Sequence, residues 1–236
     1  MTHPVISRLR DPDPAVRRQA CRAAAGDPSA VLLVDALGEA LGDPDPGVCH
    51  AASEALAELA PDHEVVTELL RRALHGDDAR LRWGAAFTKA RMAPPEPGLL
   101  PALVDALASP ESGIRWAAAR IVVDLGRLHP EALPVAAGLA RTDPNPVVRR
   151  MALFCLRALA PEEPVTVDAL LAASQDADPQ LRQAALASMA ALRAAPPQIA
   201  ERLTQVLDAD PDPAARRLAA AALAVAQSQK INASSE

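Results

Sequence analysis

The chain has 236 residues, of which 50% are apolar and only 2% aromatic, so it lacks the residues of an ordinary aromatic-rich core. Its apolar residues recur at helical spacing and predict an all-α protein. The formal charge of −6 argues against broad nucleic-acid binding, no segment approaches the ~18 apolar residues of a membrane span, and the N-terminus lacks the apolar stretch of a signal peptide.

The first element in chain order is a truncated helix over residues 3–10, which we expect to cap the chain weakly. A motif follows it, "DPAVRR" from Asp13 to Arg18, that recurs along the rest of the sequence. Its seven copies start 32, 33, 33, 34, 33 and 34 residues apart, at Asp13, Asp45, Asp78, Glu111, Asn145, Asp178 and Asp212. Spacing this regular indicates a tandem structural repeat.

Each copy has the pattern of a helix start. The acidic or Asn residue, counted as position 0, caps the helix, and proline in five of the seven copies takes the first helical position, where its missing N–H costs nothing. The apolar residue at position 3 turns into the core, and an alanine stands at position 7 of every copy. Because a methyl group is small, neighbouring helices can pack there with an interaxial distance at the short end of the usual ~8–10 Å.

A second, shorter amphipathic helix leads into the next copy, as in Ser29–Leu41 and Glu64–Leu74. A helical hairpin of this size cannot bury its apolar face alone, so the hairpins must stack. The sequence therefore predicts an all-α fold, an α-solenoid of about seven stacked helical hairpins, in a single domain over residues 1–228. We expect residues 229–236 to form a polar, frayed tail.

The pattern D-P-x-[VL]-R-x-x-A is complete from Asp13 and from Asp178, while Asn145 replaces the acid in the fifth copy and Ala215 replaces the Val or Leu in the seventh. In these residues the sequence resembles the HEAT-repeat family in its short, phycobilisome-lyase-like form. The resemblance implies a HEAT-like superhelix whose capped helices line the concave face. It also implies that the arginine at position 4, which only Cys49 replaces, reaches an aspartate of the adjacent repeat and builds a ladder.

Positions 5 and 9 vary between copies and lie one turn apart on the same side of the helix, away from the buried stripe. Position 5 holds Arg18, His50, Trp83, Trp116, Arg150, Gln183 and Arg217. Position 9 holds Arg22, Glu54, Phe87, Arg120, Phe154, Ala187 and Ala221. All four aromatic residues of the chain fall in these two rows, within the third to fifth copies.

If the capped helices line a groove, as the resemblance implies, these rings form one patch at its centre. We predict a partner- or ligand-binding site made of Trp83, Phe87, Trp116, Arg120, Arg150, Phe154, His50 and Glu54. Leaving ~100 Å² of a ring in water forgoes about 2 to 3 kcal/mol, so an exposed patch usually marks a binding surface. The alternative is that the rings fold down between successive helices and fill a core of alanines.

No catalytic constellation, metal-ligand spacing or cofactor motif stands out in the sequence. His50 and Glu54, at i and i+4, form either an acid/base pair or a solvated ion pair. The sequence also resembles bilin lyases at the level of the repeat, and an arginine-and-aromatic groove could hold a tetrapyrrole. A second resemblance is to alkylpurine DNA glycosylases, in which case the two tryptophans would act beside Glu54 or Asp124 as the acid. The acidic charge argues against the second resemblance, since those enzymes grip phosphates through a basic surface.

These observations favour a non-catalytic binding scaffold or adaptor that holds a peptide or protein partner in its concave groove, without a membrane or nucleic-acid partner. The alternative is a small-molecule-binding enzyme or carrier that uses the same central pocket. Three cysteines without metal-ligand spacing indicate reduced thiols in a cytoplasmic protein. A composition with 24 Lys and Arg residues, nearly all of them Arg, suits a GC-rich bacterial genome.

Overall fold

A computed structural model describes residues 3–192 and 196–233, and over these residues the chain is all-helical and contains no strand. The capped helices are α2 (Pro14–Ala25), α4 (Pro46–Leu59), α6 (Ala79–Met92), α8 (Ser112–Leu128), α10 (Pro146–Leu159), α12 (Pro179–Met189) and α14 (Pro213–Ala233). Linking helices precede them: α1 (Pro4–Leu9), α3 (Val34–Ala40), α5 (Glu64–Leu74), α7 (Leu100–Leu107), α9 (Ala132–Thr142), α11 (Pro164–Ala173) and α13 (Pro197–Ala209). Two short 3-10 turns, Ala30–Leu33 and Pro97–Leu99, lead into α3 and α7. The strict alternation confirms the predicted α-solenoid of helical hairpins.

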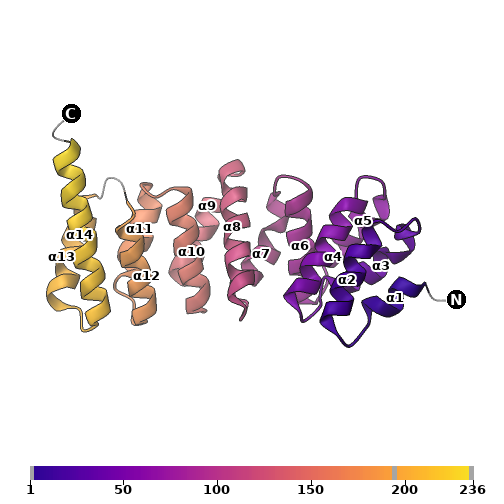
Figure 1. Cartoon of the computed structure of the whole chain (residues 1–236). Coiled ribbons are helices and arrows are strands. Elements are labelled where there is room, and N and C mark those ends of the chain that lie inside the picture. The colour runs from indigo at the N-terminus through magenta and orange to yellow at the C-terminus, as the bar shows by residue number, and fades with distance from the viewer. Residues whose placement is uncertain (1–2, 193–195, 234–236) are drawn as a thin grey trace. The chain divides into compact units, whose positions relative to one another are not determined.

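The chain divides into two compact units, residues 1–106 and 107–236. In the first unit α2, α4 and α6 pack side by side, and α1, α3 and α5 pack against them as a second layer. In the second unit α8, α10, α12 and α14 form the capped layer, while α9, α11 and α13 form the other (Figure 1). Because repeats in a solenoid contact only their neighbours, a long array divides readily, and the single-domain organisation stays a prediction.

Side chains cap six of the seven capped helices as the motif predicts. The carboxylate or amide oxygen at position 0 accepts from a backbone N–H of the first turn, at Asp13, Asp45, Asp78, Asn145, Asp178 and Asp212. The expectation is wrong at Glu111, which makes no side-chain cap bond. Glutamate carries one more methylene than aspartate, and the Glu111 N–H instead donates to Ser109 Oγ at 3.2 Å.

The alanine at position 7 is the centre of the buried stripe. All seven of these alanines are at most 1% exposed: Ala20, Ala52, Ala85, Ala118, Ala152, Ala185 and Ala219. Capped helices pack directly on one another along this row within each unit. A larger side chain there would meet a neighbouring helix, so the repeat keeps the smallest side chain that still favours a helix.

The arginine at position 4 builds the ladder that the family resemblance implies. Its guanidinium pairs with an aspartate of the following repeat in four places, with shortest N–O distances of 2.7 to 3.4 Å: Arg17 with Asp43, Arg82 with Asp105, Arg149 with Asp176, and Arg182 with Asp210. The same arginines also donate to backbone carbonyls of the turn before their own helix, as Arg17 does to Asp11 and Pro12. Each rung therefore ties one turn to the next.

The first rung shows how strongly these contacts favour the charged forms. Burial opposes ionisation of Asp43, but hydrogen bonds from Arg17 and from the Asp45 N–H outweigh it, so the pKa of Asp43 lies below its ordinary value. The hydrogen bond to Asp43 likewise raises the pKa of Arg17. Removing either partner would leave a half-buried charge without its counter-ion.

The last helix continues to Ala233, within the segment that the sequence predicts as a tail. Alanine, glutamine and lysine in this stretch are good helix formers, which extends α14 beyond its apolar part. Residues 234–236 lie outside the described residues, as do residues 1–2 at the start of the predicted domain.

Candidate functional site

The exposed face of the capped layer is a grid of side chains at positions 5, 9 and 13, one helical turn apart. In the first unit these three positions hold Arg18, Arg22 and Gly26 on or just after α2. They hold His50, Glu54 and Glu58 on α4, and Trp83, Phe87 and Arg91 on α6. In the second unit the same positions hold Trp116, Arg120 and Asp124 on α8, and Arg150, Phe154 and Ala158 on α10. On or just after α12 and on α14 the same positions hold no aromatic residue: Gln183, Ala187, Ala191, Arg217, Ala221 and Val225. Aromatic and charged groups therefore gather on α4 and α6 in one unit and on α8 and α10 in the other.

The first unit contains a closed aromatic cluster. The rings of Trp83 and Phe87 lie 5.3 Å apart between centroids, and His50 of the neighbouring helix lies 5.7 Å from Phe87. The Arg91 guanidinium lies 5.8 Å from the Phe87 ring centre, within the range of a cation–π contact. Trp83 is only 7% exposed, so the expectation of a solvent-facing indole is wrong at this position. The indole instead packs between helices, as the alternative prediction had it.

The second unit contains an open aromatic cluster. Trp116 meets Phe154 of the next capped helix edge-on, with 4.9 Å between ring centroids and an interplanar angle of 89°. The Arg157 guanidinium lies 5.4 Å from the Phe154 ring centre. Trp116 is nevertheless 49% exposed, so about half of its surface is in contact with water. This ring has the exposure that the sequence predicts.

The two arginines predicted beside the rings differ in availability. Arg120 is exposed and lies one turn after Trp116. The ion pair formed on α8 joins Arg127 to Asp124 at 3.1 Å. In the described part of the chain Arg120 has no carboxylate partner. Arg150 is half-buried and lies 3.4 Å from Asp178, the capping residue of the next repeat. Arg120 is therefore available to a ligand anion, whereas Arg150 already has the Asp178 carboxylate as its partner.

His50, Glu54 and Arg91 form a chain of polar contacts on the face of the first unit. His50 Nε2 lies 3.3 Å from Glu54 Oε1, and the same oxygen lies 3.4 Å from Arg91 Nη2. Both members of the His–Glu pair are more than 40% exposed at the side chain. The structure thus places the predicted pair in solvent and extends it by an arginine that the sequence argument did not include.

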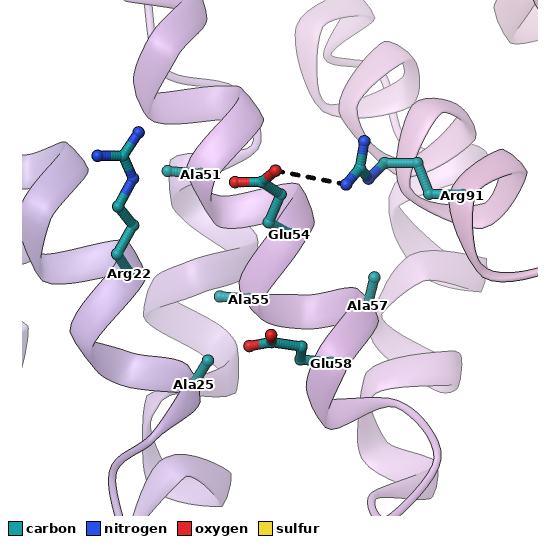
Figure 2. A pocket seen from close by; sticks show the side chains of 8 residues that line it. All are labelled: Arg22, Ala25, Ala51, Glu54, Ala55, Ala57, Glu58 and Arg91. Carbon is teal, nitrogen blue, oxygen red and sulfur yellow. Dashed lines mark hydrogen bonds and ion pairs between the residues drawn. The ribbon is translucent and has the colours of Figure 1, made fainter.

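A groove of about 540 Å³ lies beside this chain. Its walls come from all three capped helices of the first unit, and Figure 2 shows Glu54 directed toward Arg91, with Arg22 on the other side of α4. Of its charged lining residues only Glu54 was predicted as a site residue; Arg22, Glu58 and Arg91 were missed. Position 13, which holds Glu58 and Arg91, has no aromatic residue to mark it, although its spacing from position 9 places it on the same face.

Two of the three cysteines have thiols that stay protonated at ordinary pH. Burial raises the pKa of the Cys21 and Cys155 thiols to about 12, which keeps them protonated and unreactive. Over residues 3–192 and 196–233, no group of three or more His, Cys, Asp or Glu residues is arranged to hold a metal ion. Within the same ranges no helix combines the length and apolar character needed to cross a bilayer.

The fold and the grid of exposed rows define an α-solenoid repeat protein. A family model described as HEAT repeats matches residues 2–90 and 68–157, together more than half of the chain. The protein therefore belongs to the HEAT-repeat family.

Similar solved structures include designed proteins. One engineered protein is 20% identical with a TM-score of 0.42, over 98% of this chain and 71% of that chain. A designed armadillo repeat protein in complex with a (KR)4 peptide is 16% identical with a TM-score of 0.40, over 94% of this chain and 98% of that chain. No curated protein matches at the level of sequence.

Proposed function

We propose that the protein is a non-catalytic binding scaffold or adaptor that holds a peptide or protein segment on the capped layer, which we take as its concave face. The observation that carries the proposal is the open cluster of the second unit, where Trp116 is 49% exposed while packed edge-on against Phe154. An indole fixed on one side and wet on the other is typical of an interface anchor, since it offers a large apolar area at little entropic cost.

The charges around this ring indicate the kind of segment that fits. Arg120 lies one turn from Trp116 without a carboxylate partner in the described chain, and Arg157 lies over Phe154. A ligand with an aromatic or aliphatic group beside a carboxylate would place the first on the exposed indole and the second on the free guanidinium. Arg150 takes a smaller part in this proposal, because Asp178 already neutralises it.

The first-unit residues of the predicted site form a second contact region in the proposal. His50 is exposed and Phe87 and Glu54 are half-buried, so all three retain surface for a ligand. Trp83 supports Phe87 from beneath the surface rather than meeting the ligand.

We also propose that the repeats belong to the short, phycobilisome-lyase-like form, supported by the 32 to 34 residue period and the repeated D-P-x-[VL]-R-x-x-A pattern. We place the protein in the bacterial cytoplasm. Three buried cysteines without metal-ligand spacing, and basic residues that are nearly all arginine, support this placement.

Selection of a random peptide library displayed on phage against the full chain tests the proposal. We expect the enriched peptides to pair an aromatic or aliphatic residue with a nearby Asp or Glu. Trp116→Ala should weaken binding of a selected peptide by about thirtyfold, the effect of losing a hot-spot residue worth ~2 kcal/mol. Arg120→Gln should weaken it less and reduce the preference for the acidic residue.

Leu128→Ala is the matched control, because it removes an exposed apolar side chain from the same helix as Trp116, outside the predicted site. This variant should bind the selected peptide as the wild type does. If the selected peptides bound Trp116→Ala and the wild type with equal affinity, the proposed site would be wrong.

A further inference from the structure

The groove of the first unit exists because small residues line its floor. Its lining is Arg22, Ala25, Ala51, Glu54, Ala55, Ala57, Glu58 and Arg91, so four alanines separate four charged side chains. Helix α2 ends at Ala25, which is one of these alanines. The volume of about 540 Å³ lies within the range of small-ligand sites, roughly 300–1,000 Å³.

Two of the four charges in the groove are already neutralised by one another. Arg91 lies 3.4 Å from Glu54 and 5.8 Å from the Phe87 ring centre, and Glu54 also pairs with His50 at 3.3 Å. Figure 2 shows this Glu54–Arg91 contact on the α6 side of the groove. Arg22 and Glu58 form no ion pair in the part of the chain that the structure describes. The groove therefore presents one unpaired cation on α2 and one unpaired anion on α4.

We infer that this groove binds a small zwitterion, an amino acid or a short peptide with free ends. The carboxylate of the ligand meets Arg22, its ammonium group meets Glu58, and its hydrocarbon part lies on the alanine floor. Two arginines and two glutamates give the lining no net formal charge, so a ligand with a single charge gains one contact and meets repulsion at the other. A ligand with separated opposite charges gains both contacts.

The spacing of the two charged residues suits such a ligand. Arg22 is at position 9 and Glu58 at position 13 of adjacent helices, one helical turn and one helix separation apart, which places their Cα atoms roughly 11 Å from each other. Both residues line the groove, and both are exposed. A dipeptide spans at most ~7 Å when extended, so its ends reach both groups.

This inference goes beyond the proposed scaffold function and does not depend on it, since no residue of the Trp116 cluster takes part. A titration of the full ¹⁵N-labelled chain with L-alanyl-L-alanine, followed by amide chemical shifts, tests it. We expect shifts centred on residues 22–26 and 51–58. The N-acetylated dipeptide and the dipeptide amide, which each lack one charge, should bind about tenfold more weakly.

Two variants assign each end of the ligand to its residue. Arg22→Gln should bind the dipeptide and its amide equally, because the carboxylate no longer has a partner. Glu58→Gln should bind the dipeptide and its N-acetylated form equally. Both residues are exposed, and Arg141→Gln and Glu201→Gln, exposed changes on α9 and α13, should retain the full preference.

The dipeptide and its two blocked forms would bind the wild type with equal affinity if charge played no part, and that result would overturn the inference. Absence of shifts in the groove at saturating dipeptide would overturn it as well. Neither result bears on peptide capture at Trp116, which the phage selection measures separately.

Discussion

Trp83 and Trp116 occupy the same slot of consecutive repeats, and yet one is 7% exposed and the other 49%. Trp83 has Phe87 one turn later on its own helix and packs against it, with His50 of α4 closing over the same ring. Trp116 has Arg120 in that place and packs on Phe154 of the next capped helix instead. Position in the repeat fixes which face a side chain belongs to. The neighbouring rows decide how much of it water reaches.

Backbone approach adds to this difference. Gly84 follows Trp83, and a β-carbon at Gly84 would lie 2.6 Å from the Leu41 carbonyl oxygen, far inside contact distance. Ala117 follows Trp116. The first unit therefore uses a glycine to bring α6 close to the end of α3, and the tryptophan beside it is buried.

Replacing each tryptophan with alanine should separate the two slots by the largest difference in stability. We expect Trp83→Ala to lower the free energy of unfolding by about 3–5 kcal/mol, because it empties a buried volume. Trp116→Ala should cost only about 1 kcal/mol, the worth of one edge-on ring contact at a half-exposed site. Urea denaturation followed by far-UV circular dichroism measures both. Equal losses would mean that the two slots do not differ in burial.

Adding a methyl group at Gly84 should give the next largest effect. Gly84→Ala should destabilise the chain by about 1–3 kcal/mol, since overpacking against the Leu41 carbonyl outweighs the gain in helix propensity. Gly113→Ala, in the first turn of α8, is the matched control because a β-carbon there meets nothing within 4 Å. It should stabilise by up to about 1 kcal/mol. A Gly84→Ala protein as stable as the control would contradict the close approach.

Acid should weaken the first unit through its first arginine rung. The folded-state pKa of Asp43 lies below its ordinary value, so the stabilisation is complete above about pH 4 and is lost as the pH falls through the lower, folded-state pKa. Urea midpoints measured across this window should fall more steeply for the wild type than for Asp43→Asn. The exposed change Asp208→Asn on α13 serves as the control and should leave the wild-type slope unchanged.

Fluorescence should distinguish the indoles without altering stability much. Trp116→Phe leaves Trp83 as the emitter, and we expect blue-shifted emission that acrylamide quenches poorly. Trp83→Phe leaves the half-exposed Trp116, whose emission should be red-shifted and readily quenched. The same emission maximum in both variants would refute the difference in exposure.

The repeat period made the fold predictable from sequence. Capping residues, N1 prolines and the alanine at position 7 each have a local cause, so their copies predicted the capped helices and their packing stripe. The cap at Glu111 was predicted wrongly because the motif does not distinguish one carboxylate length from another. The arginine ladder was predicted from the family resemblance. Only the tertiary structure identifies Asp105 as the partner of Arg82, because Asp105 does not stand at the repeat position of the other three aspartates.

The candidate site was predictable only as a set of rows. Sequence placed Trp116, Phe154 and Arg120 on one face, because i and i+4 on a helix share a side. It missed Arg91 and Arg157, whose guanidinium groups lie over the two phenylalanines, and it missed the pairing of Arg150 with Asp178. Contacts between neighbouring helices depend on side-chain direction, which spacing along one helix does not contain.

By itself, the sequence determined the helical hairpins, their order and the face on which each side chain lies, since these depend on local capping and on a period of 3.6 residues. Tertiary structure decided which rings are buried, which arginines are paired and where alanines leave a groove. These outcomes arise between helices, where the size of one residue sets the space that its neighbour can fill.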